Sequence, residues 1–169
     1  MPKGASAKTE SEPRLKNWRL VAAVAVVAAA VLIAFLGYSQ KDNPAQKCGP
    51  YRNDKAVSIG TGKLKSEVVS TQADRAQGLS GRPCIEAGQG MLFVFEKPGK
   101  YPFWMKDMKF SIDIVWMDAN KRVIGLDTNV SPSTYPDLFV SKEPAQYVLE
   151  VQANHSKDLK VELGTPVSF

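Results

Sequence analysis

The sequence is poor in the side chains that most often build catalytic and metal sites. It has one histidine, His155, so a multi-histidine metal site is excluded and a Ser-His-Asp triad would depend on this residue alone. Its polar neighbours favour a role in a turn. The two cysteines, Cys48 and Cys84, do not form a Cys-x-x-Cys pair. No nucleophile elbow or phosphate-binding loop is present either, and we expect no cofactor.

Positive charge is concentrated at the amino end of the chain. Residues 1–19 contain five Lys and Arg against two Glu, and so carry +3 of the formal net charge of +5. Residues 39–169 lack a dense basic run with interleaved aromatic residues, which a nucleic-acid partner would favour. We therefore expect no nucleic-acid binding. The positive charge of residues 1–19 is better explained as a signal of the chain's orientation in a membrane.

An uncharged apolar run, LVAAVAVVAAAVLIAFL, occupies residues 20–36. As a helix it would span roughly 26 Å, close to the thickness of the hydrocarbon core of a bilayer. It has no polar stripe, and a single small domain could hardly bury such a helix on all sides. Because flanking positive charge stays cytoplasmic, we predict a cytoplasmic tail at 1–19 and a transmembrane anchor at 20–38.

A cleaved signal peptide is the alternative, since it also combines a basic start with an apolar centre. An apolar centre of this length is long for that role, and only residues 37–39 resemble a cleavage site. Both interpretations place residues 39–169 outside the cytoplasm, in the anchored case as the extracytoplasmic part of a single-pass membrane protein. An oxidising compartment permits a disulfide between Cys48 and Cys84, which we predict; two unpaired thiols are the alternative.

Residues 39–55 are polar and contain two prolines, which is typical of a linker. Thr71 opens a capping-box-like segment that predicts a short helix ending near Gly78, and a second helical turn is expected at 153–158. Short runs of large and β-branched residues predict strands at 57–59, 64–69, 91–95, 111–117, 122–126, 147–151 and 159–163. The predicted fold is a compact β-rich domain over residues 56–169, mainly antiparallel and either barrel-like or α+β, with one or two short helices.

Five short motifs follow one another in this part of the chain. They are DRAQGL at 74–79 with Arg82 soon after, GMLFVF at 90–95, FWMK at 103–106, IDI at 112–114 and YVLE at 147–150. Together they resemble the DUF192 family, also called UPF0127, from about residue 56 to the end. The resemblance implies a small β-rich domain of bacteria and archaea that often follows a signal or anchor segment, with no established biochemical activity.

The sequence departs from the usual pattern of that family in two places. Asp107 and Met108 stand where an asparagine and a threonine are common, and the loop at 128–146 lacks the cysteines that many relatives carry. Both changes weaken the inference that this chain shares a polar functional site with its relatives at Asp107 or in this loop.

Six charged or aromatic side chains are candidates for a ligand-binding site, namely Arg75, Arg82, Trp104, Lys106, Asp107 and Asp113. Strand alternation places Ile112, Ile114 and Trp116 on one face and Asp113 on the other. If buried, the charge of Asp113 needs a partner, since an isolated carboxylate is costly in apolar surroundings. The candidate partners are the two arginines and the lysine.

Three interpretations of this set remain open. The charges form a structural ion pair between helix and sheet, or a recognition pocket with Trp104 as its floor and the arginines facing an anionic group, or a site in which Asp113 is a catalytic acid or base. The proline-interrupted loop at 127–146 can close over a groove or cover a sheet edge.

We predict a membrane-anchored module that binds a small ligand or a component of the envelope. The alternatives are an enzyme of the hydrolase type that uses Asp113 and a purely structural envelope module.

Overall fold

The computed structural model describes residues 48–169. The predicted tail at 1–19, the predicted anchor at 20–38 and residues 39–47 of the predicted linker lie outside the described residues. Within residues 48–169, neither helix has the length and apolar character needed to cross a bilayer.

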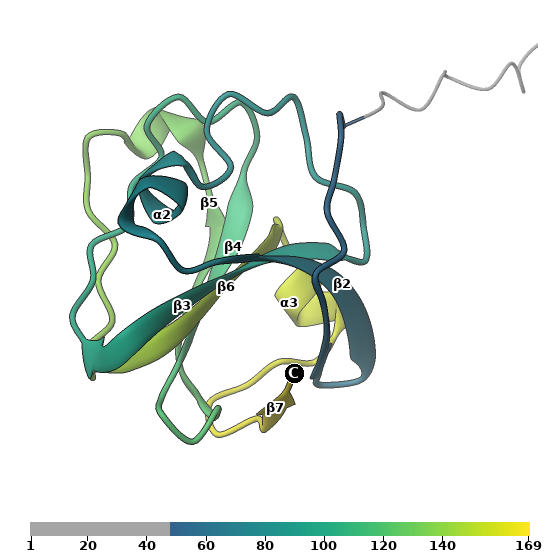
Figure 1. Cartoon of the computed structure of the whole chain (residues 1–169), viewed down its shortest axis with the longest axis vertical. Helices are drawn as coiled ribbons and strands as arrows, with labels where there is room; N and C mark the ends of the chain where they lie inside the picture. Colours follow the sequence, from purple (N-terminus) through teal and green to yellow (C-terminus); the bar gives the residue numbers. More distant parts are fainter. Residues whose placement is uncertain (1–47) are drawn as a thin grey trace, which may run out of the picture. The chain divides into compact units, whose positions relative to one another are not determined.

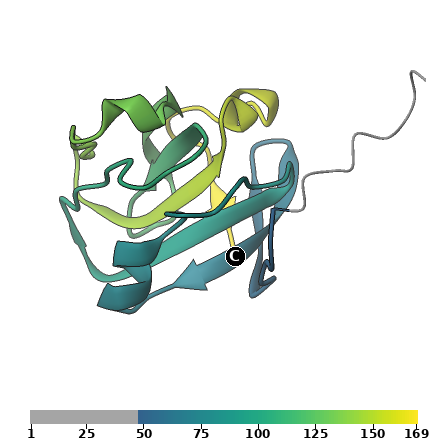
Figure 2. The same cartoon turned by 90° about the horizontal axis from the view of Figure 1, so that it is seen from above.

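Seven strands form one sheet in the order β5-β4-β6-β3-β2-β1-β7. Figures 1 and 2 show that this sheet is strongly curved. All neighbouring strands are antiparallel except β2 and β3, which are parallel. The strands are β1 Lys55–Ile59, β2 Gly62–Val69, β3 Gln89–Gly99, β4 Ile112–Met117, β5 Val123–Val130, β6 Ala145–Gln152 and β7 Val167–Ser168. The prediction of a β-rich, mainly antiparallel domain is therefore confirmed.

Within residues 48–169, two short α-helices accompany the sheet. Helix α2, Gln72–Gln77, lies in the crossover between the parallel strands β2 and β3, which places it over one face of the sheet (Figure 1). As predicted, Thr71 caps its start by accepting a hydrogen bond from the backbone N–H of Asp74, and Gly78 ends it with a φ of 49°. Helix α3, His155–Asp158, follows β6 and contacts β4 and β6. A 3-10 turn, η1, spans Pro132–Thr134.

The strand predicted at 159–163 is wrong. Leu159 closes α3, and Lys160 has a φ of 54°, so the backbone turns where an extended run was expected. Of the apolar side chains behind that prediction, Val161 is buried in the core and Leu159 packs against it, whereas Leu163 is exposed. The last strand is β7, which pairs with β1.

Apolar side chains fill both faces of the sheet. Ile114 and Trp116 of β4 point to the face covered by α2, while Val115 and Met117 point to the other, as strand alternation predicted. We call these the α2 face and the α3 face. The α2 face carries the hydrophobic cluster around Phe93, and the α3 face carries the cluster that contains Val115 and Met117.

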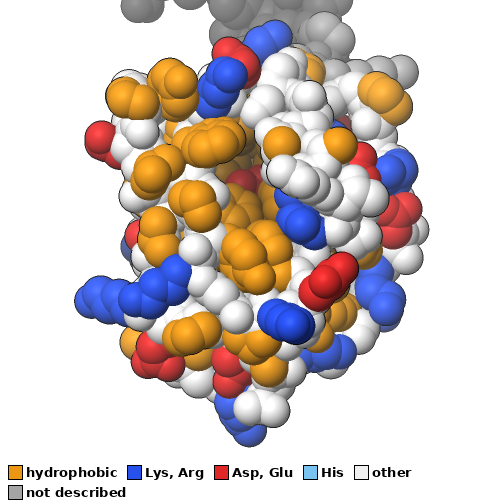
Figure 3. Space-filling view, turned by 60° about the vertical axis from the view of Figure 1, so that its left-hand side comes forward, with side chains coloured by type: hydrophobic (Ala, Val, Ile, Leu, Met, Phe, Trp, Pro, Cys, Tyr) orange, Lys and Arg blue, Asp and Glu red, His pale blue; other side chains and the backbone are white. Residues whose placement is uncertain are grey.

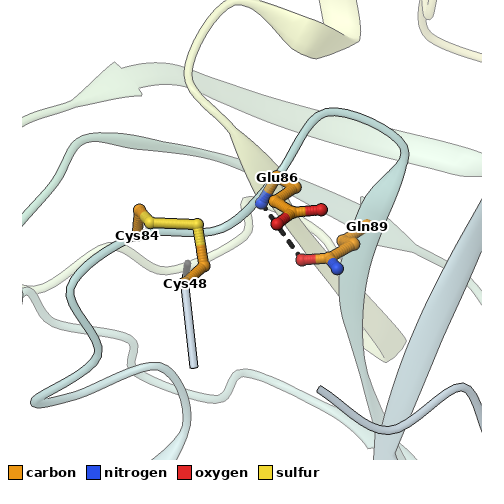
Figure 4. The surroundings of a disulfide bond; sticks show 4 residues. All are labelled: Cys48, Cys84, Glu86 and Gln89. Carbon is orange, nitrogen blue, oxygen red and sulfur yellow. Dashed lines mark hydrogen bonds between the residues drawn. A yellow bond between two sulfur atoms is a disulfide. The ribbon is translucent and has the colours of Figure 1, made fainter. Parts of the chain in front are cut away.

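A disulfide between Cys48 and Cys84 ties the start of the described chain to the loop after α2 (Figure 4), which confirms the predicted bond. The Tyr51 hydroxyl adds a second attachment, because it donates to the carbonyl of Lys65 at 2.7 Å and accepts from the N–H of Gly90 at 2.8 Å. These contacts fix the end of the segment predicted as a linker against β2 and β3.

Asp113 is fully buried on the α3 face. Its Oδ1 accepts hydrogen bonds from the backbone N–H groups of Asn129 and Asn154 at 2.7 and 2.9 Å. Its Oδ2 accepts from the N–H and the hydroxyl of Ser156 at 3.0 and 2.6 Å. The sequence suggested cationic partners; the structure shows that backbone and hydroxyl donors satisfy this carboxylate instead, because its face of the sheet meets α3.

Replacing Asp113 by asparagine tests this structural role. The amide can accept on one oxygen only, and its NH2 group faces donors, so we expect Asp113→Asn to lower the free energy of unfolding by about 3 kcal/mol. Urea denaturation followed by tryptophan fluorescence measures the change. Asp137→Asn is the matched control: this exposed carboxylate has no side-chain hydrogen bond within residues 48–169, and about 0.5 kcal/mol or less is expected. Equal effects of both variants would contradict the assignment.

Candidate ligand-binding site

A groove of about 360 Å³ opens on the α2 face between α2, β3 and the segment that follows β3. We call it the α2 groove. Figure 3 shows a hollow in the surface on this side of the molecule, bordered mostly by hydrophobic side chains. Five aromatic residues line the groove, namely Phe93, Phe95, Tyr101, Phe103 and Trp104.

Ring contacts hold the aromatic walls in place. Tyr101 stacks on Phe95 with ring centroids 3.6 Å apart, and Phe103 packs edge-to-face against Phe93 at 4.9 Å. The backbone of Phe103 also exchanges two hydrogen bonds with Phe139 of the proline-interrupted loop, at 2.9 and 2.8 Å. Trp104 remains 44% exposed. The groove thus has walls held by ring contacts and one exposed aromatic side chain, Trp104, available to a ligand.

Glu150 lies among these apolar walls. This β6 residue is paired with Met91 of β3 on one side and Ile114 of β4 on the other, and it is 6% exposed. Its Oε2 has no hydrogen-bond partner within residues 48–169. Burial raises the pKa of Glu150 to about 8, against a smaller opposing effect of Arg82. The carboxyl is therefore mostly uncharged at neutral pH.

A second carboxylate, Glu67 of β2, lies on the same face but is fully satisfied. Met91 separates it from Glu150 in the register, so the two Cα atoms are about 10 Å apart. Arg82 binds both oxygens of Glu67 at 2.8 and 2.7 Å, and the backbone N–H of Arg52 donates to one of them at 3.0 Å. Burial alone raises the pKa of Glu67, but these hydrogen bonds outweigh it and lower the pKa. Glu67 is therefore ionised.

Arg75 of α2 brings a positive charge to the groove. Its guanidinium carbon lies 4.7 Å from the centroid of the Phe95 ring, and Nη1 donates to the carbonyls of Ser70 and of Val94, the latter at 3.1 Å. The part of the chain that the structure describes offers it no carboxylate within ion-pair distance. Arg75 thus lines the α2 groove with a charge that no acid of residues 48–169 neutralises.

The six residues predicted from the sequence do not form one site. Arg75 and Trp104 line the α2 groove, whereas Arg82 is engaged with Glu67 and lines a separate hollow beyond α2. Lys106 and Asp107 are exposed.

The backbone carbonyls of Lys106 and Asp107 have a structural role. The carbonyl of Lys106 accepts from the Ser80 hydroxyl at 2.8 Å, and that of Asp107 accepts from the N–H of Gly81 at 2.9 Å, so both position the loop after α2. Asp113 lies on the opposite face of the sheet and is no part of the groove.

Sequence reasoning missed Glu150, the most unusual residue of the groove. The available signal was an acid inside the apolar run at 147–151, YVLEV, on a predicted strand. Alternation assigns this acid to the same face as Val148 and so predicts burial. Its lack of a partner depends on where Arg82 points, which the linear sequence does not reveal.

Comparison with solved structures identifies two similar folds. A protein of unknown function from Novosphingobium aromaticivorans DSM 12444 is 25% identical with a TM-score of 0.64, covering 68% of this chain and 84% of that chain. A protein from Sinorhizobium meliloti 1021, described as a "putative transcription regulator", is 27% identical with a TM-score of 0.65, covering 71% of this chain and 97% of that chain. No curated protein matches the sequence.

Residues 55–169, which include every strand and both α-helices of the part that the structure describes, match the model of DUF192, described as "Uncharacterized ACR". The match confirms the resemblance found in the five sequence motifs. The chain belongs to the DUF192 family.

Proposed function

We propose that this domain binds a small organic ligand in the α2 groove. The observation that carries the proposal is Glu150, a buried carboxyl whose Oε2 has no hydrogen-bond partner within residues 48–169. Buried polar atoms in folded proteins are nearly always hydrogen-bonded, because an unmade hydrogen bond destabilises the folded state. An exception that lines an open groove indicates an atom reserved for a ligand.

The size and walls of the groove fit this function. A volume of about 360 Å³ lies within the usual range for small-molecule sites, which is roughly 300 to 1,000 Å³. Such sites combine mostly apolar walls with a few polar groups, and here the aromatic residues supply the walls while Arg75 and Glu150 supply the polar groups. A ligand with a flat ring can lie against Phe93 and beneath Trp104.

The geometry gives little support to an enzyme that uses Asp113. Both oxygens of this carboxylate are engaged by four hydrogen bonds, and no substrate could approach them without breaking the link between β4 and α3. A purely structural module would also leave the open groove and its unpartnered Glu150 without a purpose.

We propose further that residues 20–38 anchor the chain in a membrane, with the binding domain outside the cytoplasm. The apolar run and the positive charge before it support this topology. The Cys48–Cys84 disulfide supports it independently, since such bonds persist in oxidising compartments and are rare in the cytosol.

Filling the groove tests the binding function. Three probes with the same ring and different charge, phenylacetate, 2-phenylethanol and 2-phenylethylamine, are titrated by saturation-transfer NMR into the full chain held in lipid nanodiscs. We expect at least one probe to bind the wild type and to bind Ala76→Trp at least tenfold more weakly, because Ala76 lines the groove. Ala73→Trp is the matched control, an exposed alanine of the same helix outside the groove. Binding of none of the probes, or equal binding by both variants, would remove the proposed site.

Thiol accessibility tests the topology. Intact cells are lysed with a thiol-reactive polyethylene-glycol maleimide, with and without prior reduction. We expect no modification of the wild type before reduction and two additions after it, whereas Cys48→Ser leaves Cys84 free and modified at once. Protease added to spheroplasts should digest the domain. Two reactive thiols before reduction, together with a protected domain, would contradict the proposed location.

A further inference from the structure

We propose that the ligand of the α2 groove is an organic anion, an apolar ring or chain that carries a carboxylate or a comparable oxyanion, recognised by Arg75 and by the buried carboxyl of Glu150. This inference rests on the proposed binding function and specifies its ligand class.

The charge balance around the groove favours an anion. Two cationic groups face this region, Arg75 from α2 and Arg82 from the loop after it. Arg82 is neutralised by its two hydrogen bonds to ionised Glu67 of β2. Tyr101, which follows β3, is the remaining titratable group among the lining residues, and its hydroxyl donates a hydrogen bond to the carbonyl of Lys97 at 2.7 Å. With Glu150 uncharged, the positive charge of Arg75 is left in excess.

Arg75 presents free donors in a fixed orientation. Two backbone carbonyls engage Nη1, and the Phe95 ring lies beneath the guanidinium plane at 4.7 Å. Within residues 48–169, no partner occupies Nε or Nη2. A guanidinium with such free donors binds carboxylates and other oxyanions through paired, charge-assisted hydrogen bonds. Its backbone contacts restrict its rotamers before any ligand arrives.

Glu150 contributes through its charge state. An ionised carboxylate in this apolar groove would repel an anion, whereas the protonated form carries no charge and can donate a hydrogen bond. Burial favours the protonated form, with a pKa of about 8. A cationic ligand would instead meet the unneutralised charge of Arg75 and would require Glu150 to lose its proton, so these surroundings favour an anion over an amine.

The three matched probes distinguish the ligand classes. In wild-type full chain at pH 6.5, phenylacetate should bind at least tenfold more tightly than 2-phenylethanol and 2-phenylethylamine. Arg75→Gln should reduce the preference for the acid over the alcohol to nearly one. Arg122→Gln, at an exposed arginine outside the groove, is the matched control and should keep that preference.

The pH dependence of phenylacetate affinity tests the role proposed for Glu150. Affinity for phenylacetate should fall about tenfold between pH 6.5 and pH 9, because the free protein loses the Glu150 proton around pH 8 and the ionised form excludes the anion. In Glu150→Gln, which cannot ionise, the affinities at the two pH values should be nearly equal.

The outcomes separate this inference from the function on which it rests. Tightest binding of the amine or the alcohol, blocked by Ala76→Trp, would overturn the anion and keep the groove as a ligand site. Phenylacetate binding that Arg75→Gln leaves unchanged would also overturn it. Binding of none of the three probes would remove the proposed function itself.

Discussion

Arg82 neutralises only one of the two buried acids that residues 48–169 place on the α2 face, and the candidate site depends on this difference between them. Its guanidinium binds both oxygens of Glu67 on β2. Glu150 lies two strands away on β6, where the positive charge of Arg82 is distant and no group of residues 48–169 forms a hydrogen bond with Oε2. Ionising Glu150 in this position costs roughly 5 kcal/mol relative to water. The folded protein keeps a proton that the unfolded chain loses above about pH 4.5. This residue therefore makes the fold less stable as pH rises from about 4.5 to about 8, a cost consistent with a role in binding.

The surroundings of Arg82 explain why its position is fixed. It lies in the loop between α2 and β3, which the disulfide at Cys84 ties to the start of the domain. Two further hydrogen bonds connect this loop to the carbonyls of Lys106 and Asp107. The Tyr51 hydroxyl also bonds to the backbone of β2 and of β3, the strands on either side of the loop. The disulfide and these hydrogen bonds thus hold the loop in place, so that Arg82 keeps Glu67 charged while Glu150 stays neutral.

The sequence predicted the strands well because their apolar periodicity is local, and it predicted α2 because Thr71 and Gly78 mark its ends. It failed at 159–163, where the buried Val161 reaches the core from a turn with a left-handed residue at Lys160. For the candidate site, the sequence analysis named Arg75 and Trp104, which line the groove, but it gave Asp113 cationic partners that it does not contact. Strand alternation indicates which face of the sheet a side chain occupies, but not which group it contacts on that face. That partner depends on tertiary contacts between distant segments: α3 supplies it for Asp113, and Arg82 supplies it for Glu67.

The titration of Glu150 tests the central claim most directly. Carbon-13 NMR of the full chain, with glutamate labelled at the side-chain carboxyl and Glu150→Gln used to assign the signal, follows the charge of this residue with pH. We expect a midpoint near pH 8 in the free protein. A midpoint near the ordinary value of about 4.5 would show that Glu150 is charged and satisfied at neutral pH, and would contradict the claim that the groove holds an uncharged carboxyl for a ligand.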